Sequence, residues 1–373
     1  MLRQEYRVFT RGDRLIFGKR GNQTKKYNSW AIVPPGTDRL LGPGAPETYH
    51  SVIGEAVAAS VAKDTKSSYS TAINMLAKCQ ASLGRDMQLP LSDQDVICFV
   101  AFMAERDVLD TTISGYLSAI RFAMLSAGHE CNNLRTPVVS QILRGIKNLK
   151  RDPQVLVQKK TRRAMTVDHL KLLGHALAKS ELSGHMRSLV WAGSLLAFWG
   201  SARIGELMGP SANAFDPKST LLWSDVRLSD DMVKLWVRSP KVSSPTGDIL
   251  EVFQVPDISL DPITAVKHYM SFRRRVDQGS EDLPFFIEEN GKFFTKRKFN
   301  GILHDLIDPF LRDSRDSLTG HSFRGGLATL MESAGFKKDD IQVWGRWNSE
   351  AYRRYCKEGR PKRRIFADLY KHL

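Results

Sequence analysis

The sequence predicts a mainly α-helical protein of two domains, the second of which contains a small antiparallel β-sheet. Its 373 residues exceed the ~150 residues of a typical domain, which favours two domains. Residues 51–150 repeat apolar side chains at helical spacing, whereas between residues 186 and 255 the pattern changes from helical to alternating. Long helices combined with a few short strands indicate the α+β class with a minor sheet.

The first domain is predicted at residues 51–150 as a bundle of four amphipathic helices joined by short polar turns. Ser92 precedes an apolar run at helical spacing, and Pro137 takes the first position of the last helix. Residues 1–30 carry eight Lys/Arg against two acidic residues, and a Pro/Gly-rich stretch follows. We therefore interpret residues 1–50 as a basic N-terminal extension or linker.

A basic interdomain linker is predicted at residues 151–164. Residues 144–163 carry eight Lys/Arg and a single acidic residue, and apolar periodicity stops at Leu149. Such a charge run is usually a solvated face, but here it joins two domains of a chain whose formal net charge is +15. We interpret this basic linker as a segment that runs along a series of phosphate groups and contacts them.

The second domain, predicted at residues 165–373, begins with helices and continues with a three-stranded antiparallel sheet. A first helix is predicted from Thr166 to Ala178 with Asp168 in its first turn, and a long apolar helical tract breaks near Gly200. Asp261 caps a further helix, and later helices end in a C-terminal tail helix. The three strands are predicted at residues 221–226, 232–237 and 250–255.

Composition excludes several classes of protein. The excess of 55 Lys/Arg over 40 Asp/Glu is typical of chains that bind nucleic acid or another polyanion. The sequence lacks a run of ~18 apolar residues and an N-terminal apolar core, which excludes a transmembrane helix and a signal peptide. The four cysteines lack CxxC spacing, and the zincin motif HExxH and the P-loop motif are absent. We therefore expect no metal, no cofactor and no membrane partner.

Two charged pairs are candidate functional groups, and the second of them suits a phosphate or a carboxylate. Arg203 and Glu206 interrupt an apolar tract, where a charge is costly unless it has a partner or a purpose. His321 and Arg324 lie three residues apart at the start of a predicted helix, where backbone amides favour an anion. Taken alone, the first pair also fits a buried structural ion pair and the second a surface pair.

The segment from Trp344 to Tyr355 combines two Trp, two Tyr and three Arg in twelve positions. We expect Trp344 in the core, whereas Trp347 follows a Gly-Arg turn where a core position is less natural. Tyr352 and Tyr355 lie three apart on a predicted helix and face one side. An aromatic core stripe with solvated arginines is the plain structural alternative.

The order of these motifs along the chain favours a functional interpretation over the structural alternatives. Arg-x-x-Glu, a β-hairpin with a Lys, His-x-x-Arg, Trp and Tyr in this order resembles the tyrosine recombinase (phage integrase) family over roughly residues 55–357. The segments GHSFRGG and GRWNSEAYRRY are most similar to recombinases of eukaryotic DIRS-type retrotransposons and Crypton elements. The resemblance implies a helical core-binding (SAM-like) domain and a catalytic domain in a C-shaped clamp on DNA. It implies six catalytic residues, namely Arg203, Lys241, His321, Arg324, Trp347 and Tyr355.

Three positions depart from the family pattern or leave an alternative. The usual spacing from the family's His/Trp position to its Tyr is nine, whereas Trp347 and Tyr355 are eight apart. Tyr352 lies only five from Trp347, too close for the usual geometry. Lys234 is the alternative to Lys241, but it lies within a predicted strand. Where the family commonly has His-Ser/Thr after the second Arg, this chain has two glycines, Gly325 and Gly326.

The resemblance implies DNA cleavage and rejoining through a 3′-phosphotyrosyl intermediate and a Holliday junction, without metal or ATP. Arg203 and Arg324 are implied to grip the phosphate oxygens, because Arg stays charged and forms paired hydrogen bonds. Glu206 is implied to brace Arg203. The tyrosine, with an ordinary pKa of about 10, must lose its proton to His321, and Lys241 protonates the leaving 5′ oxygen.

Two other functions remain open for the same set of residues. A type IB topoisomerase has a similar active site and relaxes DNA as a monomer. A DNA-binding regulator could keep the fold and lose the activity, but the complete catalytic set counts against this alternative.

The implied partners are a double-stranded recombination site and further copies of the chain. An apolar stripe on the tail helix suits docking on a neighbouring subunit in a homotetramer on two DNA sites: Ile365, Phe366, Leu369 and Tyr370. The candidate DNA contacts are Lys66, Arg121, Arg144, Lys147, Arg151, Lys159 and Lys160. The basic runs 159–163 and 360–364 favour the nucleus for a eukaryotic mobile element, and otherwise the cytoplasm or nucleoid is expected.

Overall fold

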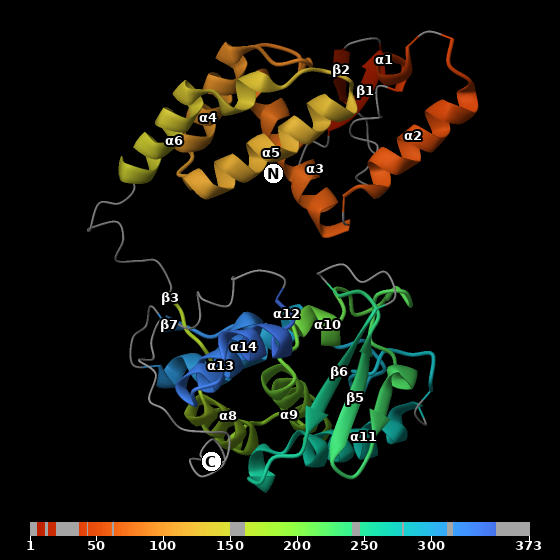
Figure 1. Ribbon diagram of the computed structural model, residues 1–373, viewed down its shortest axis with the longest axis vertical. Coiled ribbons are helices and arrows are strands. Elements are labelled where there is room, and N and C mark those ends of the chain that lie inside the picture. Colours follow the sequence, from red (N-terminus) through yellow and green to blue (C-terminus); the bar gives the residue numbers. More distant parts are fainter. Residues whose placement is uncertain are drawn as a thin grey trace. The chain divides into compact units, whose positions relative to one another are not determined.

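The computed structural model describes residues 6–11, 14–19, 37–42, 44–61, 63–149, 161–240, 247–277, 280–311 and 316–347. The chain divides into two compact units, residues 1–157 and 158–373 (Figure 1). Each unit has its own hydrophobic core. The predicted fold class is confirmed, because the described residues are mostly helical and the second unit contains a small antiparallel sheet.

Helices form the body of the first unit, around a core that includes Leu76, Phe99 and Ile120. The helix predicted after Ser92 is present, and Ser92 caps it: its hydroxyl accepts a hydrogen bond from the Asp95 amide at 3.2 Å, and the Asp95 carboxylate accepts one from the Ser92 amide at 3.1 Å. The elements are β1 (Tyr6–Arg11), β2 (Arg14–Lys19), α1 (Thr37–Leu41), α2 (Glu47–Ala59), α3 (Lys63–Ser82), α4 (Asp93–Glu105), α5 (Asp110–Ser126), the 3-10 turn η1 (Asn132–Arg135) and α6 (Pro137–Leu149).

The first fifty residues contain more regular structure than composition alone indicates. β1 and β2 pair as an antiparallel hairpin, and the short helix α1 follows. α2 begins at Glu47, whose carboxylate is favourable in the first turn of a helix beside the backbone dipole. Helical structure therefore begins before residue 51.

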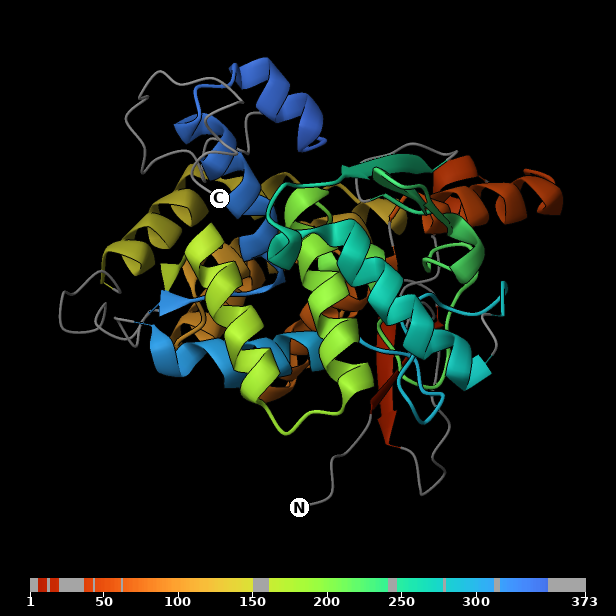
Figure 2. The same ribbon diagram turned by 90° about the horizontal axis from the view of Figure 1, so that it is seen from below.

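The second unit is built around α9 (Gly184–Trp199), which is buried along most of its length because its sequence is apolar on nearly every side. The other elements are β3 (Thr161–Arg162), α8 (Val167–Lys179), α10 (Ile204–Leu207), η2 (Trp223–Asp225), β4 (Val226–Leu228), β5 (Met232–Val237), β6 (Asp248–Phe253), η3 (Ile258–Leu260), α11 (Pro262–Asp277), α12 (Lys296–Ile307), η4 (Asp308–Phe310), β7 (Asp316–Ser317), α13 (Gly320–Ser333) and α14 (Lys338–Trp344). α9 packs against α11 and α13 (Figure 2).

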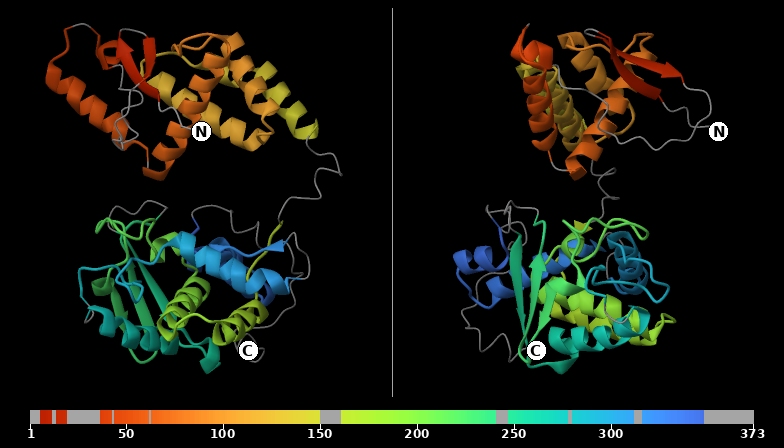
Figure 3. Two further views of the ribbon diagram at one scale, coloured as in Figure 1. Left: turned by 180° about the vertical axis from the view of Figure 1, so that it is seen from behind. Right: turned by 90° about the vertical axis from the view of Figure 1, so that its right-hand side faces the viewer.

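The three-stranded sheet of the second unit has the strand order β4-β5-β6 and is antiparallel, whereas the short strands β3 and β7 form a separate parallel pair. The three-stranded sheet lies beside the helices, and α9 and α11 contact its strands (Figure 3). Along β5, Val233, Leu235 and Val237 face the core, whereas Trp236 is exposed. Val237 pairs with Asp248 at the end of the β5–β6 hairpin, so the chain leaves the sheet at this pair.

The first predicted strand is wrong over most of its length. Instead of a strand at residues 221–226, a 3-10 turn precedes β4, which begins only at Val226. The cause is Asp225, whose buried carboxylate accepts a hydrogen bond from the Leu222 amide at 2.8 Å and closes the turn. Local side-chain bonding therefore overrides the apolar strand pattern.

The third predicted strand is displaced by two residues at each end. β6 runs over Asp248–Phe253 rather than 250–255. Beyond it, the Val255 amide donates to the carboxylate of Asp261 at 3.2 Å instead of to a neighbouring strand. Asp261 also accepts a hydrogen bond from the Thr264 amide at 2.8 Å, which confirms its predicted role as the cap of α11.

Candidate active site

Arg203 and Glu206 lie directly after the central helix α9, where the chain turns into α10. α9 ends at Gly200, as predicted, and Ser201 follows with a φ of 49°. Arg203 Nη1 donates to Glu206 Oε1 at 2.6 Å, and the Arg203 amide donates to Glu206 Oε2 at 2.9 Å. One buried carboxylate thus fixes both the main chain and the guanidinium of Arg203, which is the bracing role that the resemblance implies for Glu206.

The N-terminus of α13 lies against α10. A Cβ built on Gly320, the first residue of α13, would lie 2.5 Å from Ile204 Cγ1, so only glycine permits this approach. The Gly320 amide donates to Asn300 Oδ1 of α12 at 3.0 Å, which fixes the helix start. This close contact brings the first turns of α13, and with them His321 and Arg324, to the region of Arg203.

His321 and Arg324 lie on the first turns of α13 but differ in exposure. His321 is exposed, whereas Arg324 is buried. Arg324 Nη2 donates to the Gly345 carbonyl and, at 3.1 Å, to the Arg346 carbonyl. Its guanidinium carbon lies 4.7 Å from the centre of the Trp347 ring, within the range of a cation–π contact.

The loop after α14 completes this arrangement and corrects one expectation. Trp344, expected in the core, is exposed, although its indole N–H donates to the Trp199 carbonyl at 3.4 Å. Trp347 instead is half-buried and packs against the core. A Cβ on Gly345 would lie 1.6 Å from the Trp347 ring, so the ring folds back over this glycine. The expected core position of Trp344 is therefore wrong, whereas Trp347 both packs on the core and contacts Arg324.

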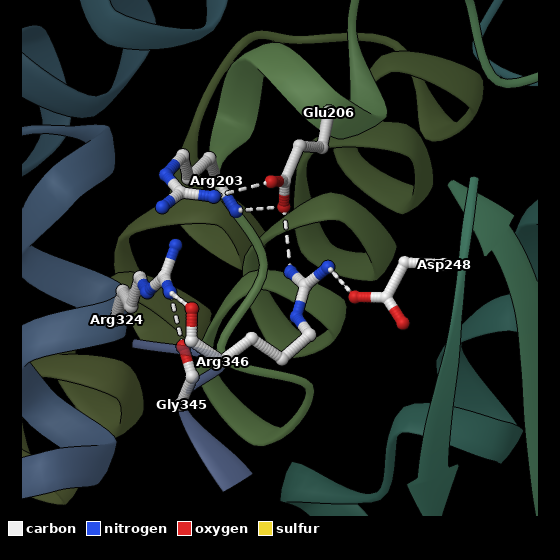
Figure 4. A network of polar contacts seen from close by, with 6 residues as sticks. All are labelled: Arg203, Glu206, Asp248, Arg324, Gly345 and Arg346. Carbon is white, nitrogen blue, oxygen red and sulfur yellow. Dashed lines mark hydrogen bonds and ion pairs between the residues drawn. The ribbon is translucent and has the colours of Figure 1, made fainter. Parts of the chain in front are cut away.

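Arg346 is a member of the site that the sequence reasoning missed. Its Nη2 donates to Glu206 Oε2 at 2.7 Å, and its Nη1 donates to Asp248 Oδ2 at 3.1 Å (Figure 4). Arg346 has a φ of 53°, unusual for a residue other than glycine. One signal in the sequence could have identified it: 355 − 346 = 9, which is the spacing to Tyr355 that the resemblance implies.

The network keeps Glu206 ionised. Burial by itself raises the pKa of Glu206, but the Arg346 guanidinium, the Arg203 amide and the Arg203 guanidinium together hold this pKa below its usual value. The cluster of Arg203, Arg324 and Arg346 with Glu206 and Asp248 has three positive and two negative charges, 3 − 2 = +1. The site therefore favours one further anion, such as a phosphodiester.

Two of the predicted catalytic residues, Lys241 and Tyr355, lie outside the described residues. So do Tyr352 and the tail residues Ile365, Phe366, Leu369 and Tyr370. The described strands place the ends of the Lys241 loop, because Asp248 at the start of β6 contacts Arg346. The alternative, Lys234, pairs with Glu251 across the sheet at 2.8 Å. Its ammonium group is held by the sheet.

One family departure has a structural reason. A Cβ on Gly326 would lie 2.0 Å from the Met165 carbonyl oxygen and 2.8 Å from the Phe198 ring. α13 therefore packs so closely against α9 and the segment before α8 that no side chain fits at Gly326. A Ser or Thr at this position is incompatible with the packing seen here.

The candidate DNA contacts of the first unit lie on three helices. Arg121 on α5 is exposed, as are Arg144 and Lys147 on α6, and Lys66 on α3 is half-buried. The remaining candidates lie outside the described residues: Arg151, Lys159 and Lys160. Among the described residues, no group of three potential metal ligands is present, and no helix of that part of the chain is long and apolar enough to span a membrane.

No family model and no curated protein matches the chain. A solved structure of a lambda integrase dimer bound to a COC′ core site matches with a TM-score of 0.51 and 14% identity, over 90% of this chain and 88% of that chain. A second lambda integrase complex with a COC′ core site matches with a TM-score of 0.53 and 15% identity, over 84% of this chain and 96% of that chain.

Two further solved structures match this chain. The XerH site-specific recombinase bound to palindromic difH substrate matches with a TM-score of 0.52 and 12% identity, over 79% of this chain and 76% of that chain. The Tn1549 transposon integrase in complex with circular intermediate DNA matches with a TM-score of 0.51 and 13% identity, over 83% and 95% of the two chains. At these identities the likeness establishes the fold, which is that of tyrosine recombinases.

Proposed function

We propose that this protein is a site-specific DNA recombinase that cuts and rejoins DNA through a covalent bond to Tyr355. The observation that carries the proposal is that the Arg203–Glu206 pair and Arg324, more than 100 residues apart in sequence, meet through Arg346 in one site with an excess of positive charge. The fold supports it, because the similar solved structures are recombinases and integrases bound to DNA.

In the proposed reaction, Tyr355 Oη attacks the phosphorus of one DNA strand and the bond from phosphorus to the 5′ oxygen breaks. His321 accepts the tyrosine proton, and Lys241 donates a proton to the departing 5′ oxygen. Arg203 and Arg324 stabilise the charge that develops on the phosphate oxygens. A 3′-phosphotyrosyl bond keeps the energy of the broken bond, so rejoining needs neither ATP nor a metal.

The experiment that tests the proposal uses DNA duplexes of randomised sequence with a single nick, which trap a covalent intermediate. Wild-type protein should give adducts that survive SDS, and Tyr355→Phe should give none while binding DNA with unchanged affinity. Sequencing of the trapped DNA should return one preferred site. DNA binding without any adduct would instead identify a regulator. Relaxation of supercoiled plasmid without sequence preference would identify a type IB topoisomerase.

We infer further that the recombinase serves a mobile element of the DIRS or Crypton type and works as a tetramer on two DNA sites. The segments GHSFRGG and GRWNSEAYRRY support the first inference, and the apolar stripe of the tail supports the second. The basic runs 159–163 and 360–364 support a nuclear location. Truncation after Arg364 tests the assembly, since a folded monomer that binds one site but forms no synaptic complex is expected.

A further inference from the structure

Arg346 connects two carboxylates that come from distant parts of the second unit. Glu206 belongs to α10, directly after the central helix, and Asp248 is the first residue of β6. The two arms of the Arg346 guanidinium reach one carboxylate each, at 2.7 Å to Glu206 and 3.1 Å to Asp248 (Figure 4). These contacts span 140 and 98 residues of sequence.

The main chain at Arg346 adds a third connection, to Arg324. The carbonyls of Gly345 and Arg346 both accept hydrogen bonds from Arg324. The positive φ of Arg346 turns the backbone so that its carbonyl faces Arg324 while its side chain extends to Glu206. This strained conformation persists because both ends of the residue are bonded.

Resting on the proposed function, we propose that Arg346 is a positioning residue that couples the β5–β6 hairpin to both phosphate-binding arginines. It acts on Arg203 through Glu206, on Arg324 through its carbonyl, and on the hairpin through Asp248. In the sequence, Lys241 lies between β5 and β6, and Tyr355 follows Arg346 by nine residues.

The chemistry of arginine is needed for this role. A planar guanidinium has several donors in a fixed fork and reaches two carboxylates at once, whereas the compact ammonium of lysine acts as a single point charge. Arg346 also sets the charge of the site. Without it, two arginines would face two carboxylates, 2 − 2 = 0, and the attraction for a phosphate would weaken.

The first test does not depend on catalysis. Hydrogen–deuterium exchange of the full chain is compared between wild type and Arg346→Met. The Arg203 amide, which donates to Glu206, and the strand-end amides at Val237 and Asp248 should all exchange about tenfold faster in the variant. Faster exchange confined to residues 344–347 would overturn the coupling. Lys298→Met is the matched control, because it removes a 2.7 Å ion pair to the buried Glu288 in the same unit and should leave these amides unchanged.

The second test measures single-turnover adduct formation on the trapping substrate at saturating protein. Arg346→Met and Asp248→Asn should each slow cleavage by about 10–100-fold, because they displace catalytic groups rather than remove them. Overall DNA affinity should fall far less than the cleavage rate, since the reacting phosphate is one contact among many. The double variant should be no slower than Arg346→Met, since both act through one link. Additive effects would overturn the proposal. Asp248→Asn alters a partly exposed residue, so it keeps the test valid if Arg346→Met fails to fold.

The two proposals fail in different ways. A wild-type protein that forms no adduct contradicts the proposed function, whereas the exchange experiment still decides whether Arg346 couples the hairpin to Arg203. The Arg346→Lys variant should behave between wild type and Arg346→Met. It should restore the charge and DNA-dependent cleavage in part, but not the protection of both regions, because lysine bonds to one carboxylate only.

Discussion

Two buried arginines of the second unit, Arg273 and Arg324, differ in what surrounds their guanidinium groups. Arg273 on α11 is fully enclosed. Its Nε donates to the Phe285 carbonyl at 3.2 Å, its Nη2 donates to the Pro284 carbonyl at 3.1 Å, and it forms an ion pair with Asp277. Each arm of this guanidinium is therefore bound to the protein, which leaves no room for a ligand.

Arg324 is almost as buried and also donates to main-chain carbonyls, but an aromatic ring lies over it and other arginines lie in the same network. Its Nη2 is bound to two carbonyls of a loop, and the Trp347 ring covers its guanidinium. Two further arginines, Arg203 and Arg346, are only half-buried and belong to the same network. Burial of an arginine therefore does not identify a catalytic group. What distinguishes the site is an excess of positive charge that reaches the surface.

The comparison of Arg273 with Arg324 predicts its largest effect for an Arg273 variant, as a loss of stability. Arg273→Met leaves two buried carbonyls and the half-buried Asp277 without their arginine partner, and it should lower the free energy of unfolding by about 3–5 kcal/mol. Urea unfolding measures the loss. The cleavage rate per folded molecule should stay at the wild-type value. A variant that unfolds like wild type, or that cleaves DNA more slowly while folded, would contradict the assignment of Arg273 as structural.

The next effect concerns the barrier to cleavage. Arg324→Ala removes a donor at the charge that develops on the phosphate, and it should slow adduct formation by about 10²–10³-fold. Arg203→Ala should act similarly. Duplex affinity should remain close to wild type, because each arginine is one phosphate contact among many. Equal losses of binding and cleavage would show that the two residues anchor DNA generally.

The sequence predicts the local parts of this site well. Arg203 with Glu206 and His321 with Arg324 are separated by three residues, and each pair was recognisable because charge interrupts an apolar helix or opens one. The helix boundaries at Ser92 and Gly200 likewise follow from capping chemistry within a few residues.

The distant contacts could not be predicted in the same way. Arg346 reaches Glu206 and Asp248 only through tertiary folding, and no periodic pattern marks a contact across such a separation. The strand predicted at residues 221–226 failed for a local reason, the hydrogen bond from the Leu222 amide to the Asp225 carboxylate, and a more distant contact strengthens it. The apolar pattern was real, but Asp225 is held by Arg238, thirteen residues later in sequence, at 2.6 Å.

The smallest effect expected is a change of stability with pH that belongs to Glu206. Glu206 forms an ion pair with the half-buried guanidinium of Arg203, just as Asp277 forms one with the buried guanidinium of Arg273. Because the folded-state pKa of Glu206 lies below its unfolded value of about 4.3, its contribution is fully present above that value. The contribution is lost as the pH falls through the lower, folded-state pKa.

The difference in unfolding free energy between wild type and Glu206→Gln should therefore be constant near neutral pH and shrink in acid. Urea unfolding at a series of pH values measures it. Asp95, whose pKa is also lowered despite the opposing effect of its partial burial, contributes equally to both proteins and cancels in the difference. Asp95→Asn is the control, since it should change the acid stability of both proteins alike. A difference that grows as the pH falls would mean that Glu206 is protonated in the folded protein and that Arg203 and Arg346 do not hold it ionised.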